Sequence, residues 1–318
     1  MGFKTDTIAA ISTAMTNSGI GIVRLSGEDA FSIIDKIYKG KSPKLLSEQK
    51  SHTIHYGYIM DGEQTIDEVL VLLMRGPHSY TGEDTVELQC HGSPAMLAAG
   101  LEALLAAGAR QALPGEFTKR AFLNGQLDLT QAEAVIDLID AETAEAAANA
   151  AGQLGGALLR RIDPVYNDLR DLCSHFHAVL DYPDEDIEDF GRDELAQTLR
   201  RAAEAVSALL STYERGKILR QGVRTVLLGR PNAGKSSLFN ALAGFDRVIV
   251  TEIAGTTRDT VEEPVKVGGV LLRLTDTAGI REAGDRIEAM GVERSERAAR
   301  EAQLAIFVCD GSRPPDAG

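Results

Sequence analysis

Alternation between apolar and polar side chains predicts a strand-rich first segment. Residues 20–25, 52–60, 68–74 and 85–90 are rich in β-branched and aromatic side chains, a composition typical of strands. Asp61-Gly62 is a turn signal between the second and third of these runs. Polar and apolar residues alternate along the last run, so one of its faces is expected to be buried, with Glu87 on the other.

Two helices are expected among these strands. Residues 27–39 follow the first strand as a helical segment. Ser93-Pro94 combines a capping serine with a proline at the first helical position, so a second helix is expected over residues 95–107, ending at Gly108. Strands and helices that alternate in this way predict an α/β or α+β domain over residues 1–118.

A helical domain is expected over residues 119–217, beyond the boundary that Pro114 marks. Thr130 and Glu133 have the spacing of a capping box ahead of a helix with an apolar face. Residues 141–151 are rich in alanine, which favours helix but buries little area per residue. The apolar face comprises Val135, Ile136, Leu138 and Ile139.

Two polar clusters in this domain have alternative interpretations. Pro183 breaks a second long helix, and the acidic residues 184–189 that follow either hold a cation or form a solvated loop. Their spacing is not that of a calcium-binding loop. His175 and His177 are either a surface or core pair or part of a metal site, and no further ligands lie near them in the sequence.

The third segment, residues 218–318, has the pattern of a nucleotide-binding domain. A strand at 225–228 leads through a glycine-rich turn into a helix that is expected to begin at Ser237 and to be closed by Gly244. Further strands are expected at 265–274 and 304–309. A complete doubly wound domain needs more strand–helix units than these, so we expect this nucleotide domain to be incomplete.

Composition is that of an ordinary globular protein, with 318 residues, 44% hydrophobic and 25% charged, enough for two or three domains. The formal charge of −14 argues against broad nonspecific binding of nucleic acid. Cys90, Cys173 and Cys309 lack metal-site spacing, which indicates reduced thiols and a cytoplasmic protein. No secretory signal is expected, and the longest apolar stretch, residues 95–109, is too short to span a bilayer, so no membrane partner is expected.

Residues 229–236 spell G-x-x-x-x-G-K-S between a short apolar strand and a helix, the context of a phosphate-binding loop. Glycines let the backbone turn its N–H groups inward, and the helix N-terminus adds positive potential. Lys235 supplies a point charge, and Ser236 would place its hydroxyl on Mg²⁺. The sequence therefore predicts binding of a nucleoside triphosphate.

Two further motifs make this prediction more specific. Asp276 ends an apolar strand 41 residues after Lys235, a spacing that allows its carboxylate to reach the metal through water. Gly279 offers a backbone N–H to the γ-phosphate, and residues 255–259 supply a threonine for the remaining face of the metal. Three motifs in this order predict a switch-type GTPase with a Ras-like domain.

One side chain expected in the second switch is missing. Ras-like enzymes carry a water-orienting glutamine after the glycine of this motif, but the residue here is Ile280. Another group must therefore orient the attacking water and neutralise the developing charge. Glu288, in the segment that follows, is an acid placed for the first of these tasks.

Motifs along nearly the whole chain resemble the tRNA-modification GTPase family MnmE (TrmE). In the third segment they are GRPNAGKSS at 229–237, TEIAGTTRD at 251–259 and DTAGIRE at 276–282. GIGIVRLSG at 19–27, YTGEDTVELQ at 80–89, HG at 91–92, PGEF at 114–117 and AFLN at 121–124 resemble the folate-binding N-terminal domain of that family. LDLTQAEAVIDLI at 127–139 resembles the start of its helical domain.

The resemblance implies which residues bind nucleotide and metals. Lys235 and Glu288 would be the catalytic residues, with Glu288 orienting water. Mg²⁺ would be held by Ser236 and Thr257, with Asp276 acting through water. K⁺ would stand where other GTPases use an arginine finger, on Asn232, Thr251, Ile253 and Thr256. The implied GTP-binding residues are Asn232, Ala233, Gly234, Lys235, Ser236, Ser237, Thr251, Glu252, Ile253, Ala254, Gly255, Thr256, Thr257, Asp276, Thr277, Ala278 and Gly279.

The resemblance also implies a one-carbon cofactor and partners. Arg24, Glu87 and Gln126 would line a site for 5-formyl- or 5,10-methylene-tetrahydrofolate, although the family often has a basic residue where this chain has Gln126. With the flavoprotein MnmG (GidA), the protein would attach a carboxymethylaminomethyl-type group to C5 of the wobble uridine (U34) of certain tRNAs. It would be a homodimer joined through the N-terminal domain, whose nucleotide domains approach each other on binding GTP.

The expected architecture is thus a folate-binding-type α/β domain (1–118), a helical domain (119–217) and an incomplete P-loop GTPase domain (218–318). The N-K-x-D element that reads guanine and the C-terminal cysteine motif of the family are not in this sequence, so guanine specificity rests on the resemblance. Two alternatives stay open. One is a ribosome-assembly or translation GTPase, which does not predict residues 1–124, and the other is a folate-dependent transferase with a regulatory nucleotide domain.

Overall fold

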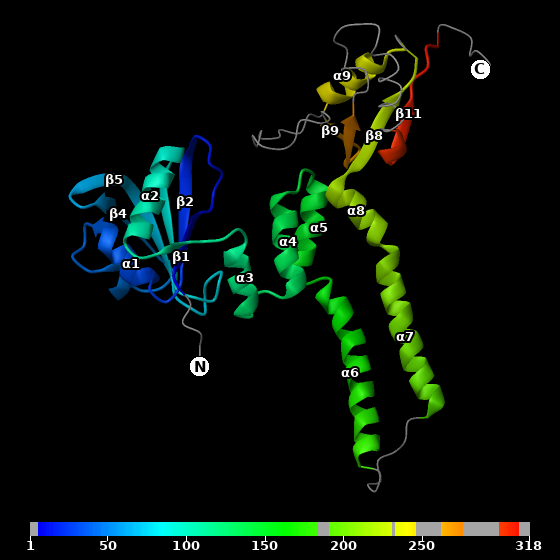
Figure 1. Ribbon diagram of the computed structural model, residues 1–318, viewed down its shortest axis with the longest axis horizontal. Coiled ribbons are helices and arrows are strands. Elements are labelled where there is room, and N and C mark those ends of the chain that lie inside the picture. The colour runs from blue at the N-terminus through cyan, green and yellow to red at the C-terminus, as the bar shows by residue number, and fades with distance from the viewer. Residues whose placement is uncertain (1–5, 183–190, 231–232, 246–261, 276–298, 312–318) are drawn as a thin grey trace. The chain divides into compact units, whose positions relative to one another are not determined.

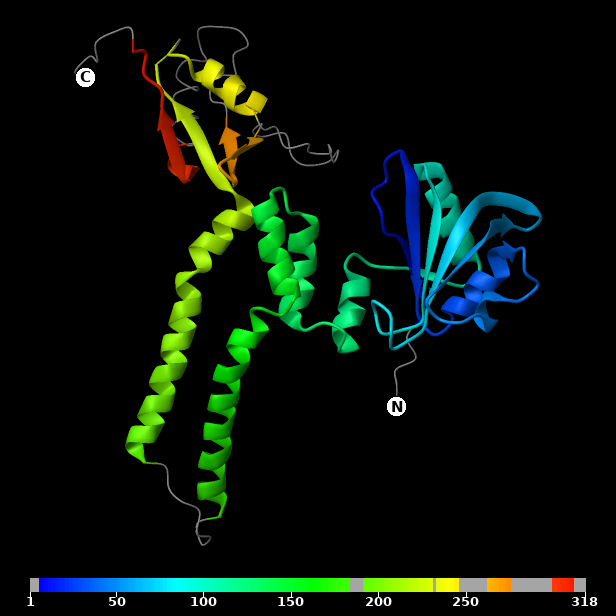
Figure 2. The same ribbon diagram turned by 180° about the vertical axis from the view of Figure 1, so that it is seen from behind.

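The computed structural model describes residues 6–182, 191–230, 233–245, 262–275 and 299–311. The chain divides into two compact units, residues 1–132 and 133–318. Figure 1 shows both units, and Figure 2 shows them from behind. The first unit is built on a mixed sheet, and the second combines helices with a smaller sheet, in agreement with the expected multidomain α/β plus α fold class.

A seven-stranded sheet forms the centre of the first unit. Its strand order is β3-β4-β5-β6-β2-β1-β7, and neighbouring strands are antiparallel except for β1 and β7. The strands are β1 (Ile8–Ile11), β2 (Ser18–Ser26), β3 (Tyr38–Gly40), β4 (Thr53–Asp61), β5 (Gln64–Met74), β6 (Thr85–Gly92) and β7 (Arg110–Gln111). The four strands expected from the hydrophobic pattern correspond to β2, β4, β5 and β6.

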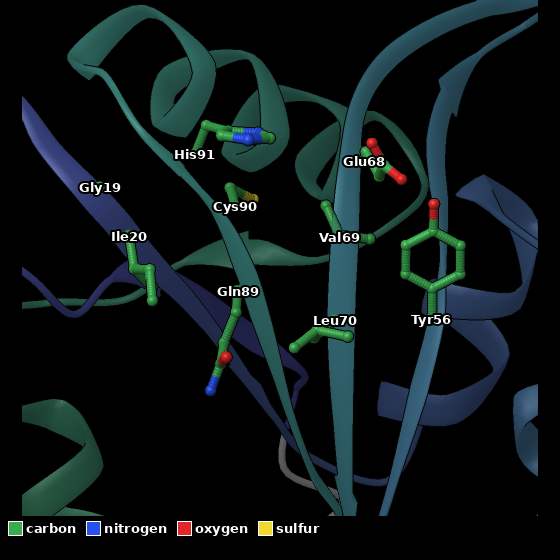
Figure 3. Close-up of a pocket in the computed structure, with 9 residues that line it drawn as sticks. All are labelled: Gly19, Ile20, Tyr56, Glu68, Val69, Leu70, Gln89, Cys90 and His91. Carbon is green, nitrogen blue, oxygen red and sulfur yellow. The ribbon is translucent and has the colours of Figure 1, made fainter.

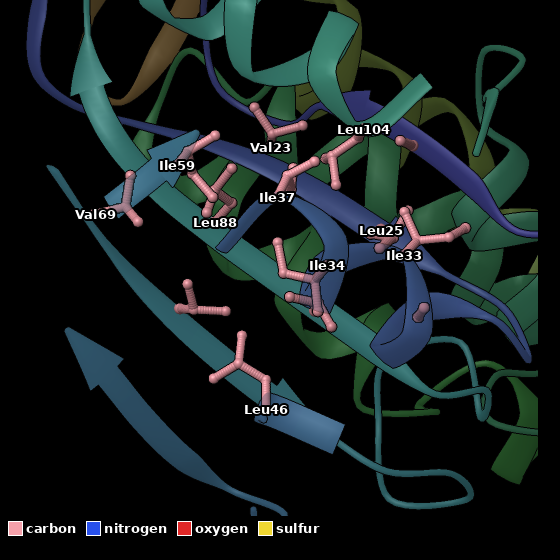
Figure 4. Close-up of a cluster of buried hydrophobic side chains, with 14 of the residues drawn as sticks. Val23, Leu25, Ile33, Ile34, Ile37, Leu46, Ile59, Val69, Leu88 and Leu104 are labelled. Carbon is pink, nitrogen blue, oxygen red and sulfur yellow. The ribbon is translucent and has the colours of Figure 1, made fainter. Parts of the chain in front are cut away.

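Helices α1 (Ala30–Ile37) and α2 (Pro94–Ala106) cover one face of this sheet. The expected serine cap is confirmed, because Ser93 Oγ accepts a hydrogen bond of 3.2 Å from Met96 N. Apolar side chains of both helices and the sheet form the core of the unit (Figure 4), together with Leu46 from the short 3₁₀ turn Leu46–Glu48. Burying this area is the main stabilising contribution to the unit.

The other face of the sheet keeps several apolar side chains exposed. Along β5, Val69, Val71 and Leu73 are buried under the helices, whereas Leu70 between them is 39% exposed. The period of two along a strand explains this alternation. Ile54 on β4 is exposed by 62% on the same pattern.

The first predicted helix is shorter than expected. A helix was expected to continue to Lys39, but α1 ends at Ile37 and Tyr38 has extended dihedral angles, φ −99° and ψ 135°. Tyr38 and Lys39 instead pair with Ile59 and Tyr58 of β4. Backbone pairing of β3 with β4 therefore ends α1 two residues before the predicted end of the helix.

In the described part of the chain, six helices follow in sequence before the second sheet. They are α3 (Glu116–Leu123), α4 (Leu129–Ile139), α5 (Ala144–Leu154), α6 (Leu159–Asp181), α7 (Arg192–Ser211) and, leading into the sheet, α8 (Tyr213–Gln221). The predicted boundary at residue 118 lies inside α3, and the division between the two compact units lies inside α4. The limits 1–118, 119–217 and 218–318 therefore remain a proposal.

The capping box of α4 lies two residues before the predicted one. Asp128 Oδ1 accepts hydrogen bonds from Gln131 N at 2.9 Å and from Thr130 Oγ1 at 2.6 Å. The side chain of Gln131 in turn accepts from Asp128 N at 2.9 Å. The prediction of Thr130 and Glu133 was thus wrong in register, because Asp128, two residues before Thr130, makes the reciprocal bonds with Gln131.

Helices α6 and α7 run side by side in both views (Figures 1 and 2). Neither helix contains a buried residue. On α6, Phe176 is 56% exposed, and on α7, Leu210 is 70% exposed. His175 and His177 lie on α6, and the acidic residues 184–189 lie outside the described part of the chain.

Within the described residues, the second sheet has four strands in the order β11-β8-β10-β9. They are β8 (Val223–Leu228), β9 (Glu262–Val267), β10 (Val270–Thr275) and β11 (Leu304–Phe307), and α9 (Lys235–Phe245) follows β8. Strands β11, β8 and β10 are parallel, whereas β9 is antiparallel to β10.

The single strand expected over residues 265–274 is a hairpin of two strands. Gly268 and Gly269 have φ values of +57° and +84° and reverse the chain between β9 and β10. Two adjacent residues with positive φ are the signature of a type I′ turn, which joins strands in a two-residue loop. The apolar residues on both sides of the glycines led to one strand being predicted.

A single buried residue, Gly222, separates α8 from β8. Its φ is +73°, and a Cβ atom there would lie 2.8 Å from the carbonyl oxygen of Leu271 on β10. Arg273 of β10 reinforces this junction, donating from Nε to Gln221 O at 2.8 Å and from Nη2 to Glu142 Oε1 at 2.7 Å. Strand β10 therefore contacts both the end of α8 and the segment before α5.

Candidate functional site

The predicted phosphate-binding loop connects β8 to α9. Gly229 directly follows β8 with φ +145°, and a Cβ atom there would lie 2.3 Å from Val308 O, beyond the end of β11. Val308 N donates to Leu228 O at 2.7 Å, which explains the close approach of the two strand ends. Only glycine fits this position.

Lys235 is the first residue of α9, two residues earlier than the predicted helix start, and Gly244 lies within the helix and does not end it. The Nζ atom of Lys235 donates to Gly229 O at 2.7 Å and to Arg230 O at 2.8 Å. Gly234 before it has φ +96° and open space around its Cα atom. The ammonium group thus lies over the main chain of the loop, while the side chain of Ser236 is exposed on the first turn of α9.

Sheet topology places this loop where α/β domains bind ligands. Strand β8 lies between β10 and β11, so the order of parallel strands reverses beside it. Ligands bind at such a reversal, beyond the carboxyl ends of the strands. Thr275, the last residue of β10, pairs with Val226 of β8, and Asp276 is the next residue in the sequence.

Of the predicted nucleotide-site residues, the structure describes Ala233, Gly234, Lys235, Ser236 and Ser237, which lie together at the start of α9. The other predicted residues lie outside the described part of the chain. They are Asn232, Thr251, Glu252, Ile253, Ala254, Gly255, Thr256, Thr257, Asp276, Thr277, Ala278, Gly279 and Glu288.

Arg24 and Glu87, predicted for the N-terminal site, lie opposite each other on β2 and β6. Arg24 Nη2 and Glu87 Oε1 are 2.8 Å apart, and the side chains are 24% and 16% exposed. The aromatic rings of Tyr80 and Phe117 lie 5.0 Å and 5.5 Å from the Arg24 guanidinium carbon. Both distances are within the range of cation–π attraction.

Gln126, the third predicted residue, follows α3, and its main-chain N donates to Ala121 O at 2.8 Å. Its Nε2 atom would lie 3.1 Å from a Cβ atom at Gly82, two residues after Tyr80. Gln126 thus packs on the loop that carries Tyr80, whereas Arg24 and Glu87 are in direct contact.

The roles of Tyr80 and Phe117 were missed in the sequence, although both lie in motifs that pointed to this domain. Their rings belong to the segment between β5 and β6 and to α3, which are distant in sequence from Arg24. One signal could have identified the two rings. Arg24 lies on a predicted strand, and both aromatic residues lie in motif segments, so a cation–π contact between them could have been considered.

A second polar feature lies at the end of β6, beside a groove of about 170 Å³ on the open face of the sheet (Figure 3). His91 Nδ1 and Asp67 Oδ1 are 2.7 Å apart, and Asp67 is 8% exposed. The hydrogen bond to Asp67 raises the pKa of His91, with a smaller contribution from Glu68. Burial raises the pKa of the neighbouring Cys90 thiol to about 12, so Cys90 is not a nucleophile at neutral pH.

Among the described residues, no three His, Cys, Asp or Glu side chains gather as metal ligands. No helix in that part of the chain has the length and apolar character needed to cross a membrane.

Comparison with known proteins gives two family matches. Residues 7–126 match the model of the GTP-binding protein TrmE N-terminus, and residues 129–309 match that of the MnmE helical domain. The tRNA modification GTPase MnmE of Lachnoclostridium phytofermentans is 53% identical over 313 residues, or 98% of this chain and 68% of that protein. The same-named protein of Thermoanaerobacter pseudethanolicus is 49% identical over 310 residues, 97% of this chain and 67% of its own length. That of Acetivibrio thermocellus is 46% identical over 317 residues, with coverage of 99% and 68%.

Proposed function

Since this chain belongs to the MnmE (TrmE) family of tRNA modification GTPases, we propose that it hydrolyses GTP in a reaction that modifies C5 of the wobble uridine (U34) of tRNA. The observation that carries the proposal is the loop from β8 to α9, in which Lys235 opens a helix directly after a glycine-rich turn. The match over residues 7–126 favours this function over a ribosome-assembly or translation GTPase.

The loop would bind the triphosphate through main-chain N–H groups and Lys235. The N-terminus of α9 creates a positive electrostatic potential at the loop. Lys235 Nζ donates to two main-chain carbonyls, and phosphate oxygens would take over as its acceptors. Such an exchange keeps the ammonium group hydrogen-bonded in both states.

A magnesium ion would be held beside the phosphate-binding loop by oxygen ligands. Ser236 is exposed on the first turn of α9, and Asp276 directly follows the last residue of β10. Oxygen ligands of this kind are those that Mg²⁺ prefers, and the ion when bound neutralises phosphate charge. Thr257 would be the third protein residue that holds the magnesium ion.

We further propose that K⁺ assists hydrolysis, held by Asn232, Thr251, Ile253 and Thr256. Ile280 cannot orient water, and Glu288 would do so in its place. The proposal rests on the sequence motifs, since these residues lie outside the described part of the chain.

The N-terminal unit would bind the reduced folate that supplies the one-carbon group. Glu87 offers a carboxylate to N–H donors of a heterocycle, and Arg24 offers a guanidinium beside two aromatic rings. We propose that Gln126 lies at the rim of the same site. The alternative of a transferase with a regulatory nucleotide domain shares this site and differs in whether modification needs hydrolysis.

Two partners complete the proposal, a flavoprotein and a second copy of this chain. The copy would join through the N-terminal unit, whose open sheet face exposes Ile20, Ile54, Tyr56 and Leu70 by 63%, 62%, 40% and 39%. Apolar side chains gathered on one face are typical of protein interfaces.

Hydrolysis of GTP by the full-length protein in KCl and in NaCl, at equal ionic strength, tests the proposed function. We expect a steeply higher rate in KCl, because the proposed potassium ion would neutralise the charge that develops on the phosphate in the transition state. Lys235→Ala should abolish nucleotide binding in either salt. Equal rates in the two salts would rule out the role of potassium, and unimpaired binding by Lys235→Ala would rule out the loop as the nucleotide site.

A further inference from the structure

Arg120 of α3 is a nearly buried guanidinium that contacts three carboxylate residues. Its side chain is 9% exposed. Nη1 donates to Asp6 O at 2.8 Å and to Glu83 Oε2 at 3.1 Å. Nη2 donates to Asp6 Oδ1 at 2.9 Å and to Glu116 Oε1 at 3.2 Å. A buried charge is tolerated only when it is paired in this way, so the network fixes where α3 can lie.

Glu83 connects the Arg120 network to buried hydroxyl groups of β2, β6 and the segment before β6. Ser26 Oγ donates to Glu83 Oε2 at 2.8 Å and lies 2.7 Å from Thr81 Oγ1, which is 3.2 Å from Thr85 Oγ1. All three hydroxyl residues are fully buried. The segment between β5 and β6 is therefore tied to β2 and β6 by buried hydroxyls, and α3 is tied to that segment through Glu83.

Charge in the network is strongly stabilised. Hydrogen bonds from Arg110 first, and also from Leu113 N and Arg120, lower the pKa of Glu116 to about 2. Burial acts to lower the pKa of Arg120, but its bonds to Glu83, Glu116 and Asp6 outweigh burial and raise it. Glu116 and Arg120 are thus both charged at neutral pH.

The two segments that Arg120 joins also carry the rings that face Arg24. Tyr80 belongs to the segment that contains Glu83, and Phe117 belongs to α3. Tyr80 Oη lies 2.9 Å from Thr118 Oγ1, a second link between the same segments. In the described part of the chain, Arg120 donates hydrogen bonds to Asp6, Glu83 and Glu116. It makes no hydrogen bond there to Arg24 or Glu87, so it does not contact the predicted site pair through a hydrogen bond.

We propose that Arg120 is a positioning residue of the N-terminal ligand site, which holds α3 against the segment before β6 so that Tyr80 and Phe117 flank Arg24. The inference rests on the proposed function, since the ligand is the reduced folate proposed for that site. Lysine cannot replace Arg120 fully, because a single ammonium lacks the planar fork that reaches Asp6, Glu83 and Glu116 together.

The test is calorimetric titration of 5-formyl-tetrahydrofolate into the intact protein and its Arg120→Lys variant. We expect Arg120→Lys to weaken binding by roughly tenfold, a size typical of losing a hydrogen-bonded support of a ligand site. Arg110→Gln is the matched control, because Arg110 bonds to Asp6 and Glu116 but not to Glu83. As Arg110 is exposed, its loss should change binding by less than about twofold.

A double-mutant cycle separates positioning from general stability. If Arg120 acts through the rings of Tyr80 and Phe117, then adding Arg120→Lys to a variant with both Tyr80→Ala and Phe117→Ala should weaken binding no further than the loss of the two rings alone. Effects that multiply in the combined variant would overturn the proposal, and so would unchanged binding by Arg120→Lys. Should Arg120→Lys fail to fold by circular dichroism, Glu83→Gln replaces it in the same cycle.

A ligand-free measurement keeps the two proposals distinguishable. In protein labelled with fluorotyrosine, the ¹⁹F resonance of Tyr80, assigned with Tyr80→Phe, should shift in Arg120→Lys and stay in place in Arg110→Gln. If the unmodified protein binds no folate, the proposed cofactor is wrong, while the Tyr80 resonance still tests the link from Arg120 to the site. An unmoved resonance would overturn that link.

Discussion

At the scale of single residues, the pair of His91 and Asp67 links protonation to stability. Asp67 is buried and also accepts from His91 N at 2.8 Å, so its carboxylate is held in place on β5. The imidazole is 68% exposed, and its pKa is raised above the ordinary value of 6.5. A raised pKa in the folded state means that the protonated imidazole favours folding.

We predict that His91→Gln lowers the melting temperature more under mildly acidic conditions than under alkaline ones. The stabilising effect of the pair is fully present below the ordinary pKa of 6.5 and is lost as pH rises through the higher folded-state pKa. Melting curves of both proteins across this range, with an NMR titration of the His91 ring, provide the measurement. A difference that is constant with pH would contradict the prediction.

The sequence predicted part of the candidate site at this scale. Lys235 opens the helix that was expected after the glycine-rich turn, although this helix begins two residues before the predicted start, and Arg24 and Glu87 are in contact. Tyr80, Phe117 and Arg120 could not be assigned roles, because their contacts depend on how α3 folds back onto the sheet. Local patterns contain no information about such long-range packing.

At the scale of elements, the junction between β8 and α9 depends on glycine. Gly229 approaches Val308 O too closely for a side chain, and its positive φ would also strain one. Gly234 has a positive φ but open space around it. The two glycines of the loop are thus required for different reasons.

We predict that Gly229→Ala lowers the free energy of unfolding by about 1–3 kcal/mol or more, the cost of a strained backbone with a clash added to it. Gly234→Ala is the control, and it should cost less because only the dihedral strain applies. Urea denaturation followed by circular dichroism measures both. Similar costs for the two variants would show that the approach of β11 is unimportant.

Element types were easier to predict than element boundaries. Strands β2, β4, β5 and β6 appeared in the hydrophobic pattern because one of their faces is covered by helices. The hairpin at Gly268 and Gly269 was missed, since the apolar pattern on both sides of the turn looks continuous. The cap at Asp128 was displaced because two overlapping capping boxes fit the same sequence.

At the scale of the whole molecule, the chain is two compact units that differ in how they are stabilised. The first has a continuous apolar core between a sheet and two helices. In the second, α6 and α7 bury no residue. Units with separate cores can unfold separately.

We predict that calorimetry of the intact chain gives more than one unfolding transition. Reduced folate should raise the temperature of the transition of the first unit, since a ligand stabilises the state that binds it, and should leave the other transition in place. Magnesium without folate is the control for nonspecific effects. One cooperative transition that moves as a whole would contradict the prediction.

The junction at Gly222 has a mechanical consequence for the second unit. One residue, Gly222, separates α8 from β8, and one residue, Thr212, separates α7 from α8. No loop therefore interrupts the chain between the sheet and the far end of α7. Helix α7 has 20 residues, about 30 Å of length, so a tilt of about 10° at its base moves its tip by about 5 Å. A small rotation of β8 at the phosphate loop would therefore produce a larger displacement at the far end of α7.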